Sequence, residues 1–139
     1  MLNTRTSAST LGHGPLVTIP SDATLRDAAG RLHAETIGAL AVEGEHGLAG
    51  VFTERDLVDA VARRVDLDVA RVADHLSRPV ISARPEDTLL DVALQMLDAG
   101  TRHIPVVDDL DRPQAMVSLR DLLRPLVLQA MTPARRDDC

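Results

Sequence analysis

The chain carries one short pattern twice, and this internal repeat limits its fold more than any other feature. Segment 53–56, with the sequence TERD, follows the apolar run 48–52, and segment 118–121, with the sequence SLRD, follows the apolar run 115–117. In both copies a hydroxyl, an arginine and a carboxylate stand where a buried strand is predicted to turn directly into a helix. The structural unit is therefore about half of the chain, which contains two equivalent polar clusters.

The match between the copies extends well beyond these two segments. At an offset of 64 residues, segment 15–18 matches 79–82 and segment 40–42 matches 104–106, and after one inserted residue in the turn 108–113 the offset is 65. A single insertion that falls in a loop is typical of a duplicated unit. Each copy is predicted to run strand, helix, strand, strand, helix. Units of about 60 residues bury too little apolar surface to be stable alone, so the copies are expected to pack together.

The repeat also predicts the domain organisation of a mixed α/β (α+β) fold. A loose tail is expected over residues 1–13, followed by the first repeat over 14–64. A connector with a short helix is expected over 65–77, the second repeat over 78–131, and a frayed tail over 132–139.

Composition excludes several classes of function. The formal net charge of −6 argues against a nucleic-acid partner. No apolar run approaches the ~20 residues that cross a bilayer, and the N-terminus lacks an apolar signal core, so a cytoplasmic protein without a membrane partner is expected. The one cysteine is Cys139, and the five histidines show no ligand spacing, so no metal site is predicted. No nucleophile and base pair is visible, and we expect no catalytic residues and no enzyme.

The repeated polar pattern has a purely structural interpretation that must be weighed first. Segments 24–27 and 88–91 also place Thr three residues before Asp, which is the pattern of a helix capping box. Segments 53–56 and 118–121 differ because they contain an arginine and follow a strand without an intervening loop. A helix N-terminus beside a guanidinium suits a phosphate, and a nearby carboxylate suits ribose hydroxyls. These two segments therefore indicate nucleotide binding as well as capping.

Two segments carry a resemblance to a known family. Segment 50–56, GVFTERD, closely resembles the signature that ends each cystathionine-β-synthase (CBS) domain, and segment 102–108, RHIPVVD, resembles the preceding strand motif. The resemblance covers both copies, about residues 14–127, and the tandem arrangement resembles a CBS pair, or Bateman module. It implies two repeats packed through their sheets around a pseudo-twofold axis, with two clefts between them. It also implies an adenosyl ligand such as AMP, ADP, ATP or S-adenosylmethionine.

The same resemblance implies roles for particular residues. Asp56 and Asp121 would hold the ribose, and the phosphate would meet Thr53, Arg55, Ser118 and Arg120. The adenine would meet mostly backbone, at Thr18, Ile19, Ala39, Leu40, Ala41, Ser82, Ala83, His103, Ile104 and Pro105. The copies also depart from the family pattern. Ala41 stands where the second copy has Pro105, and Ala115 stands where the first has Gly50.

These departures favour one functional cleft over two. Glycine permits a close backbone approach, so Ala115 is expected to narrow one cleft. The cleft built on segment 53–56 is favoured as the ligand site because its signature is the stronger match, and the cleft built on segment 118–121 is the alternative.

The sequence thus predicts a stand-alone regulatory module that binds an adenosyl ligand between its repeats and forms a homodimer. The module would act on a regulated protein that the sequence does not name. The alternative is a degenerate CBS pair that binds no ligand and serves only for dimerisation or protein docking.

Overall fold

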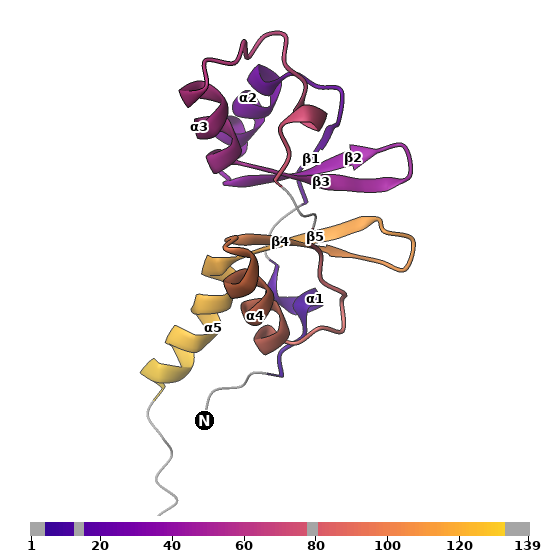
Figure 1. Ribbon diagram of the computed structural model, residues 1–139. Helices are drawn as coiled ribbons and strands as arrows, with labels where there is room; N and C mark the ends of the chain where they lie inside the picture. The colour runs from indigo at the N-terminus through magenta and orange to yellow at the C-terminus, as the bar shows by residue number, and fades with distance from the viewer. Residues whose placement is uncertain (1–4, 13–15, 78–80, 133–139) are drawn as a thin grey trace, which may run out of the picture.

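The structure is a computed structural model that describes residues 5–12, 16–77 and 81–132 (Figure 1). It consists of two similar units, each a small sheet with helices on its outer side. The two sheets face one another at the middle of the molecule, where β2 (Ala39–Gly44) contacts β5 (Pro113–Ser118) and β3 (Gly47–Thr53) contacts β4 (His103–Val107). The predicted packing of two β-α-β-β-α repeats through their sheets is confirmed.

The first unit contains a complete three-stranded sheet. Strand β1 (Thr18–Pro20) pairs in parallel with β2, which forms an antiparallel hairpin with β3. Helices α2 (Leu25–Glu35) and α3 (Glu54–Ala62) pack on the sheet. Phe52, Leu40 and Leu25 are completely buried in the core of this unit.

The second unit repeats this plan with a smaller sheet. Helix α4 (Leu89–Ala99) precedes the antiparallel pair β4 and β5, and helix α5 (Leu119–Met131) follows without a loop. The counterpart of β1 is reduced to a single parallel bridge between Ala83 and Val106. The strand expected at the start of the second copy is thus not formed at Ile81 and Ser82, and residues 78–80 lie outside the described part of the chain.

Each of the four longer helices begins with a capping box, as the Thr/Ser-x-x-Asp pattern predicts. In each, the N-cap hydroxyl accepts the N–H of the Asp three residues later, and the Asp side chain accepts the N–H of the cap. The backbone N–H of Thr88 that donates to Asp91 lowers the pKa of this carboxyl below its usual value. Capping of this kind stabilises a helix end by about 1 kcal/mol.

The N-terminal segment differs from the expected loose tail over residues 1–13. Residues Ala8–Leu11 form the short helix α1, and both Ala8 and Leu11 are buried in the core of the second unit. The N–H of Ala8 donates to the carbonyl oxygen of Asp87 at 2.6 Å. The sequence did not reveal this packing because two buried apolar residues are too few to form a helical stripe.

The connector between the repeats packs on the first unit in the same way as residues 5–12 pack on the second. Its short 3-10 helix, Val72–Asp74, packs on the first unit, where Val72 is completely buried. The bridge between Ser7 and Thr88 corresponds, at the offset of 64, to the bridge between Arg71 and Thr24. We call residues 5–12 and 69–76 the closing segments. The first unit is closed by the segment that follows it, whereas the second is closed by a segment from the start of the chain.

Within the described ranges, none of the helices combines the length and the apolar character that a membrane crossing requires. Among the same residues, no three His, Cys, Asp or Glu side chains gather in a way that could hold a metal ion.

Candidate functional site: two clefts between the repeats

Two clefts lie at the junction of the two units. The first cleft contains segment 53–56 and has a volume of about 960 Å³. The second cleft contains segment 118–121 and has a volume of about 1210 Å³. Each combines a helix N-terminus of one unit with the strand-entry segment of the other, which is 99–103 in the first cleft and 36–39 in the second. Volumes of this size are sufficient for a small-molecule ligand.

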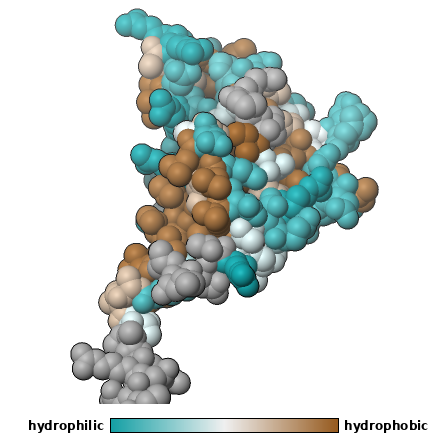
Figure 2. Space-filling view, turned by 60° about the horizontal axis from the view of Figure 1, so that its bottom comes forward, coloured by the Kyte–Doolittle hydropathy of each residue, from teal (hydrophilic) through white to brown (hydrophobic). Residues whose placement is uncertain are grey.

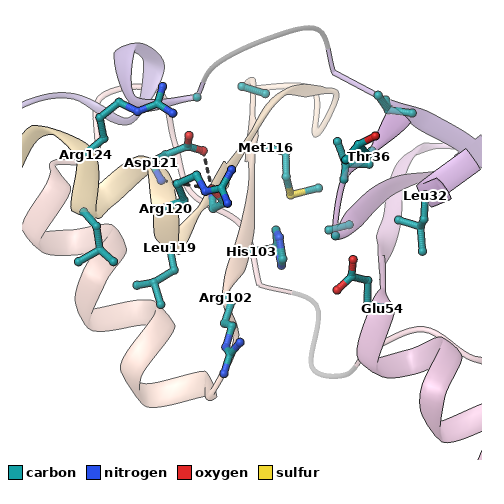
Figure 3. Close-up of a pocket in the computed structure, with 18 of the residues that line it drawn as sticks. Leu32, Thr36, Glu54, Arg102, His103, Met116, Leu119, Arg120, Asp121 and Arg124 are labelled. Atoms are coloured by element: carbon teal, nitrogen blue, oxygen red, sulfur yellow. Dashed lines mark hydrogen bonds between the residues drawn. The ribbon is translucent and has the colours of Figure 1, made fainter. Parts of the chain in front are cut away.

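The second cleft presents a carboxylate with spare hydrogen-bonding capacity (Figure 3). Asp121 has only 9% of its surface exposed, and its Oδ2 accepts the N–H of Ser118 at 2.7 Å. Its Oδ1 accepts no hydrogen bond from the described residues. Arg120 and Arg124, one turn apart on α5, line the same cleft. Among the described residues, this cleft therefore offers a carboxylate oxygen without a hydrogen-bonding partner beside two guanidinium groups.

The equivalent carboxylate of the first cleft is already engaged. Asp56 accepts the N–H of Thr53 at 2.8 Å and the Thr53 hydroxyl at 3.0 Å. In addition, the hydroxyl of Ser77, in the connector, lies 2.8 and 2.7 Å from the two oxygens of Asp56. A ligand hydroxyl that binds Asp56 would compete with Ser77. Sequence analysis did not single out Ser77, because nothing in its neighbourhood shows that the connector returns to helix α3.

Four residues line both clefts and form what we call the shared wall: Gly38, Glu54, Arg102 and His103. A Cβ atom at Gly38 would lie 3.0 Å from Cε1 of His103, so the glycine makes room for the imidazole ring. Burial lowers the pKa of His103, an effect that Arg102 increases and that the carboxylates of Glu54 and Asp121 oppose. The imidazole is therefore neutral at physiological pH.

The residues predicted to meet adenine are only partly brought to the clefts. His103 lines both clefts and Ala39 lines the second, whereas the other predicted positions line neither: Thr18, Ile19, Leu40, Ala41, Ser82, Ala83, Ile104 and Pro105. The backbone N–H and C=O groups of several of these residues form hydrogen bonds between strands, for example the bond that the Ala83 N–H donates to the Pro105 carbonyl oxygen at 2.8 Å. Val17 and Ile81, just before the predicted positions, line the second and first clefts respectively.

The predicted phosphate and ribose residues behave differently. Thr53, Arg55 and Asp56 all line the first cleft, and Ser118, Arg120 and Asp121 all line the second. Arg124, which was not among the predicted residues, lines the second cleft as well. Its spacing is the signal that indicates it, because residues four apart on a helix share a face and Arg124 follows Arg120 at this distance.

The expectation that Ala115 narrows a cleft is not met. Ala115 lines the second cleft, which is the larger of the two. A Cβ atom at Gly12 would lie 3.2 Å from that of Ala115, and one at Gly50 would lie 3.0 Å from Cδ1 of Leu76. At this contact the first unit pairs a glycine on the strand with Leu76 of its closing segment, and the second unit pairs Ala115 on the strand with Gly12 of its closing segment. The methyl group of Ala115 therefore fills space that the leucine side chain occupies in the first unit.

These features define a pair of tandem repeats that form paired inter-repeat clefts. The model of the CBS domain family matches residues 9–63 and 72–128, and the chain therefore belongs to this family.

Several solved structures share the fold. The CBS domain pair of protein MJ0100, in complex with 5′-methylthioadenosine and S-adenosyl-L-methionine, has a TM-score of 0.81 and 26% sequence identity, over 89% of this chain and 98% of that one. The CBS domain protein PAE2072 from Pyrobaculum aerophilum, complexed with AMP, has a TM-score of 0.79 and 28% identity, over 91% and 99% of the two chains.

Among curated proteins, an uncharacterised 17.7 kDa protein of Acidianus ambivalens is 28% identical over 88% of this chain and 74% of its own length. The chain spans much less of other relatives, for example 25% of a Methanocaldococcus jannaschii protein that is 38% identical over 72 residues. It spans 21% of the L-aspartate semialdehyde sulfurtransferase of the same organism, at 30% identity. Sequences similar to this chain thus occur both in short proteins and within longer ones.

Proposed function

We propose that this CBS pair is a regulatory module that binds an adenosyl ligand, either an adenine nucleotide or S-adenosylmethionine, in the clefts between its repeats. The observation that carries the proposal is the second cleft, where a buried carboxylate lies beside Arg120 and Arg124 and one of its oxygens accepts no hydrogen bond from the described part of the chain. A carboxylate accepts the hydrogen bonds that ribose hydroxyls donate, and guanidinium groups bind phosphate. Two CBS structures with 26% and 28% identity hold ligands of this class.

The location of the clefts supports a regulatory role. Each cleft is lined by residues of both units, so a bound ligand would contact both repeats at once. Such a ligand favours one relative position of the repeats over others, and this differential affinity is what any ligand-driven switch requires. A ligand at a hundred times its dissociation constant stabilises the folded state by ~2.7 kcal/mol.

The proposal is tested by thermal shift and calorimetry with AMP, ATP and S-adenosylmethionine. Asp121→Ala should weaken binding by at least about tenfold, because a hydrogen bond to a charged group contributes about 1.5–3 kcal/mol. Asp27→Ala is the matched control, since Asp27 makes the same capping box but lines neither cleft. Equal losses in both variants, or no shift with any of the three compounds at millimolar concentration, would contradict the assignment.

A second proposal concerns a homodimer, for which the outer face of the second unit gives a specific reason. Hydrophobic residues gather on one face of the molecule in Figure 2. On α4, which lines neither cleft over these positions, Leu90, Leu94 and Leu97 are 49%, 51% and 78% exposed. A contiguous exposed apolar patch marks a protein interaction surface. If the chain binds no ligand, this surface still supports the alternative function of a dimerisation module.

The dimer proposal predicts a change of molecular mass. The double substitution Leu94→Glu and Leu97→Glu should convert a dimer to a monomer in light scattering after size-exclusion chromatography. The matched control is Gly30→Glu with His33→Glu at the equivalent positions of α2, which should leave the mass unchanged. A wild-type chain that is monomeric at high concentration would refute this proposal.

A further inference from the structure

We infer that the two clefts accept adenosyl ligands of different charge. The second cleft takes a phosphate-bearing nucleotide, and the first takes an adenosyl compound without phosphate. This inference rests on the proposed function, because it names the ligand class of each cleft.

The charged residues that belong to only one cleft carry the argument. Among the residues that the structure describes, these are Arg55, Asp56 and Asp59 in the first cleft, which leave one negative charge in excess. In the second cleft the described ones are Arg120, Asp121 and Arg124, which leave one positive charge in excess. The residues Glu54 and Arg102 of the shared wall face both clefts and add no difference between them. The clefts thus differ through one equivalent position, where the first has an acid and the second a base.

That position is Asp59 in the first repeat and Arg124 in the second, separated by the offset of 65. Asp59 forms an ion pair with Arg63 at 3.2 Å, but both side chains are more than half exposed, and such pairs contribute little in water. In the second repeat the residue equivalent to Arg63 is Leu128, which has no charge and cannot form an ion pair with Arg124. No ion pair within the described ranges engages Arg120 or Arg124. The positive charge of the second cleft is therefore available to a ligand.

The spacing of the two basic residues on α5 also favours a phosphate in the second cleft. In the second cleft, Arg120 and Arg124 lie one turn apart, an arrangement in which two guanidinium groups can bind one phosphate.

The test compares AMP with adenosine, which differ only in the phosphate. Asp56→Ala disables the first cleft and Asp121→Ala disables the second, and calorimetry then gives both dissociation constants for the remaining cleft. With the second cleft intact, AMP should bind ~5-fold more tightly than adenosine at low salt, and this advantage should shrink as salt screens the charges. With the first cleft intact, AMP should have no advantage, and S-adenosylmethionine should bind at least as tightly as AMP.

Exchanging the charge at the deciding position provides an independent test in the otherwise unaltered chain. Asp59 and Arg124 are exposed, so Arg124→Asp and Asp59→Arg leave the cores intact. Arg124→Asp should remove the preference for AMP, and Asp59→Arg should increase it. Arg112→Asp is the control, because it makes the same change of net charge at a position that lines neither cleft.

The outcomes distinguish this inference from the proposed function. If AMP and adenosine bind with the same affinity ratio in both clefts, or if the charge exchange leaves the ratio unchanged, the inference is overturned and the proposed function stands. If the wild-type chain binds none of AMP, ATP and S-adenosylmethionine, the proposed function fails, and this inference fails with it.

Discussion

The two clefts show how one duplicated site diverges in two different ways. Where the copies differ in packing, the change in one residue is compensated by its neighbour. Gly50 faces Leu76 in the first unit, whereas Ala115 faces Gly12 in the second. The polar groups differ in another way: Ser77 donates a hydrogen bond to Asp56, whereas one oxygen of Asp121 accepts none from the residues that the structure describes. Packing tolerates little loss of volume, but a solvent-accessible cleft tolerates a change of charge or of hydrogen-bonding partner.

The largest expected effect tests whether the two cores are equivalent. Phe52 and Val117 occupy the same position of the repeat, and both are completely buried. Phe52→Ala should destabilise the protein by about 3–5 kcal/mol, and Val117→Ala by about 2 kcal/mol, because the smaller side chain leaves the smaller cavity. Urea denaturation measures both values.

The same experiment shows whether the halves unfold together. A single transition shifted by both variants would mean that the units form one cooperative structure. Two transitions, each sensitive to only one variant, would mean that each unit is stable by itself. A larger loss for Val117→Ala than for Phe52→Ala would contradict the equivalence of the two cores.

A smaller loss of stability, with a change in ligand affinity, is expected when Ser77 is replaced. Ser77→Ala removes the hydroxyl that donates to Asp56, so the protein should lose about 1 kcal/mol of stability. The first cleft should at the same time bind adenosine more tightly, because the ribose no longer competes with Ser77. Calorimetry on the variant that also carries Asp121→Ala isolates the first cleft. A weaker affinity for adenosine would show that Ser77 contributes to ligand binding and does not compete with it.

The smallest expected effect is on the pH dependence of stability, and it involves His103 in the shared wall. Its pKa in the folded state lies below the ordinary value of 6.5, chiefly because of burial. When the pH falls through 6.5, the unfolded chain takes up a proton on His103 before the folded protein does, so this residue destabilises the folded state at acidic pH. At pH values well above 6.5 the imidazole is neutral in both states, and His103 makes no pH-dependent contribution to stability. His103→Gln should therefore lose less stability than the wild type between about pH 7.5 and about pH 5. Identical pH profiles in thermal unfolding would exclude this role.

Much of the fold could be predicted from the sequence because it depends on local signals. The capping residues, the apolar stripes of the helices and the fixed offset of the repeat all lie within short windows, and the structure confirms the repeated units that they indicate. The ribose and phosphate candidates line the clefts for the same reason, since they belong to the capping segments 53–56 and 118–121.

What could not be predicted depends on contacts between distant segments. The role of Ser77 follows from the path of the connector back to α3, and the burial of Ala8 follows from a core formed about 80 residues later. Which strand-entry residues line the clefts depends on the sheets in the same way: Val17 and Ile81 each line a cleft, whereas their neighbours Thr18 and Ser82 do not. Sequence patterns alone do not determine such a choice.

The closing segments have a consequence for the order in which the protein acquires its structure during synthesis. The residues that complete the first core, up to Leu76, are synthesised directly after the rest of that core, so its members become available together. Ala8 and Leu11 are synthesised before the first unit, yet the core that buries them extends to Leu122 and is synthesised after that unit. Segment 5–12 must therefore wait for the second unit before it can pack, and this step joins residues from the two ends of the repeat pair.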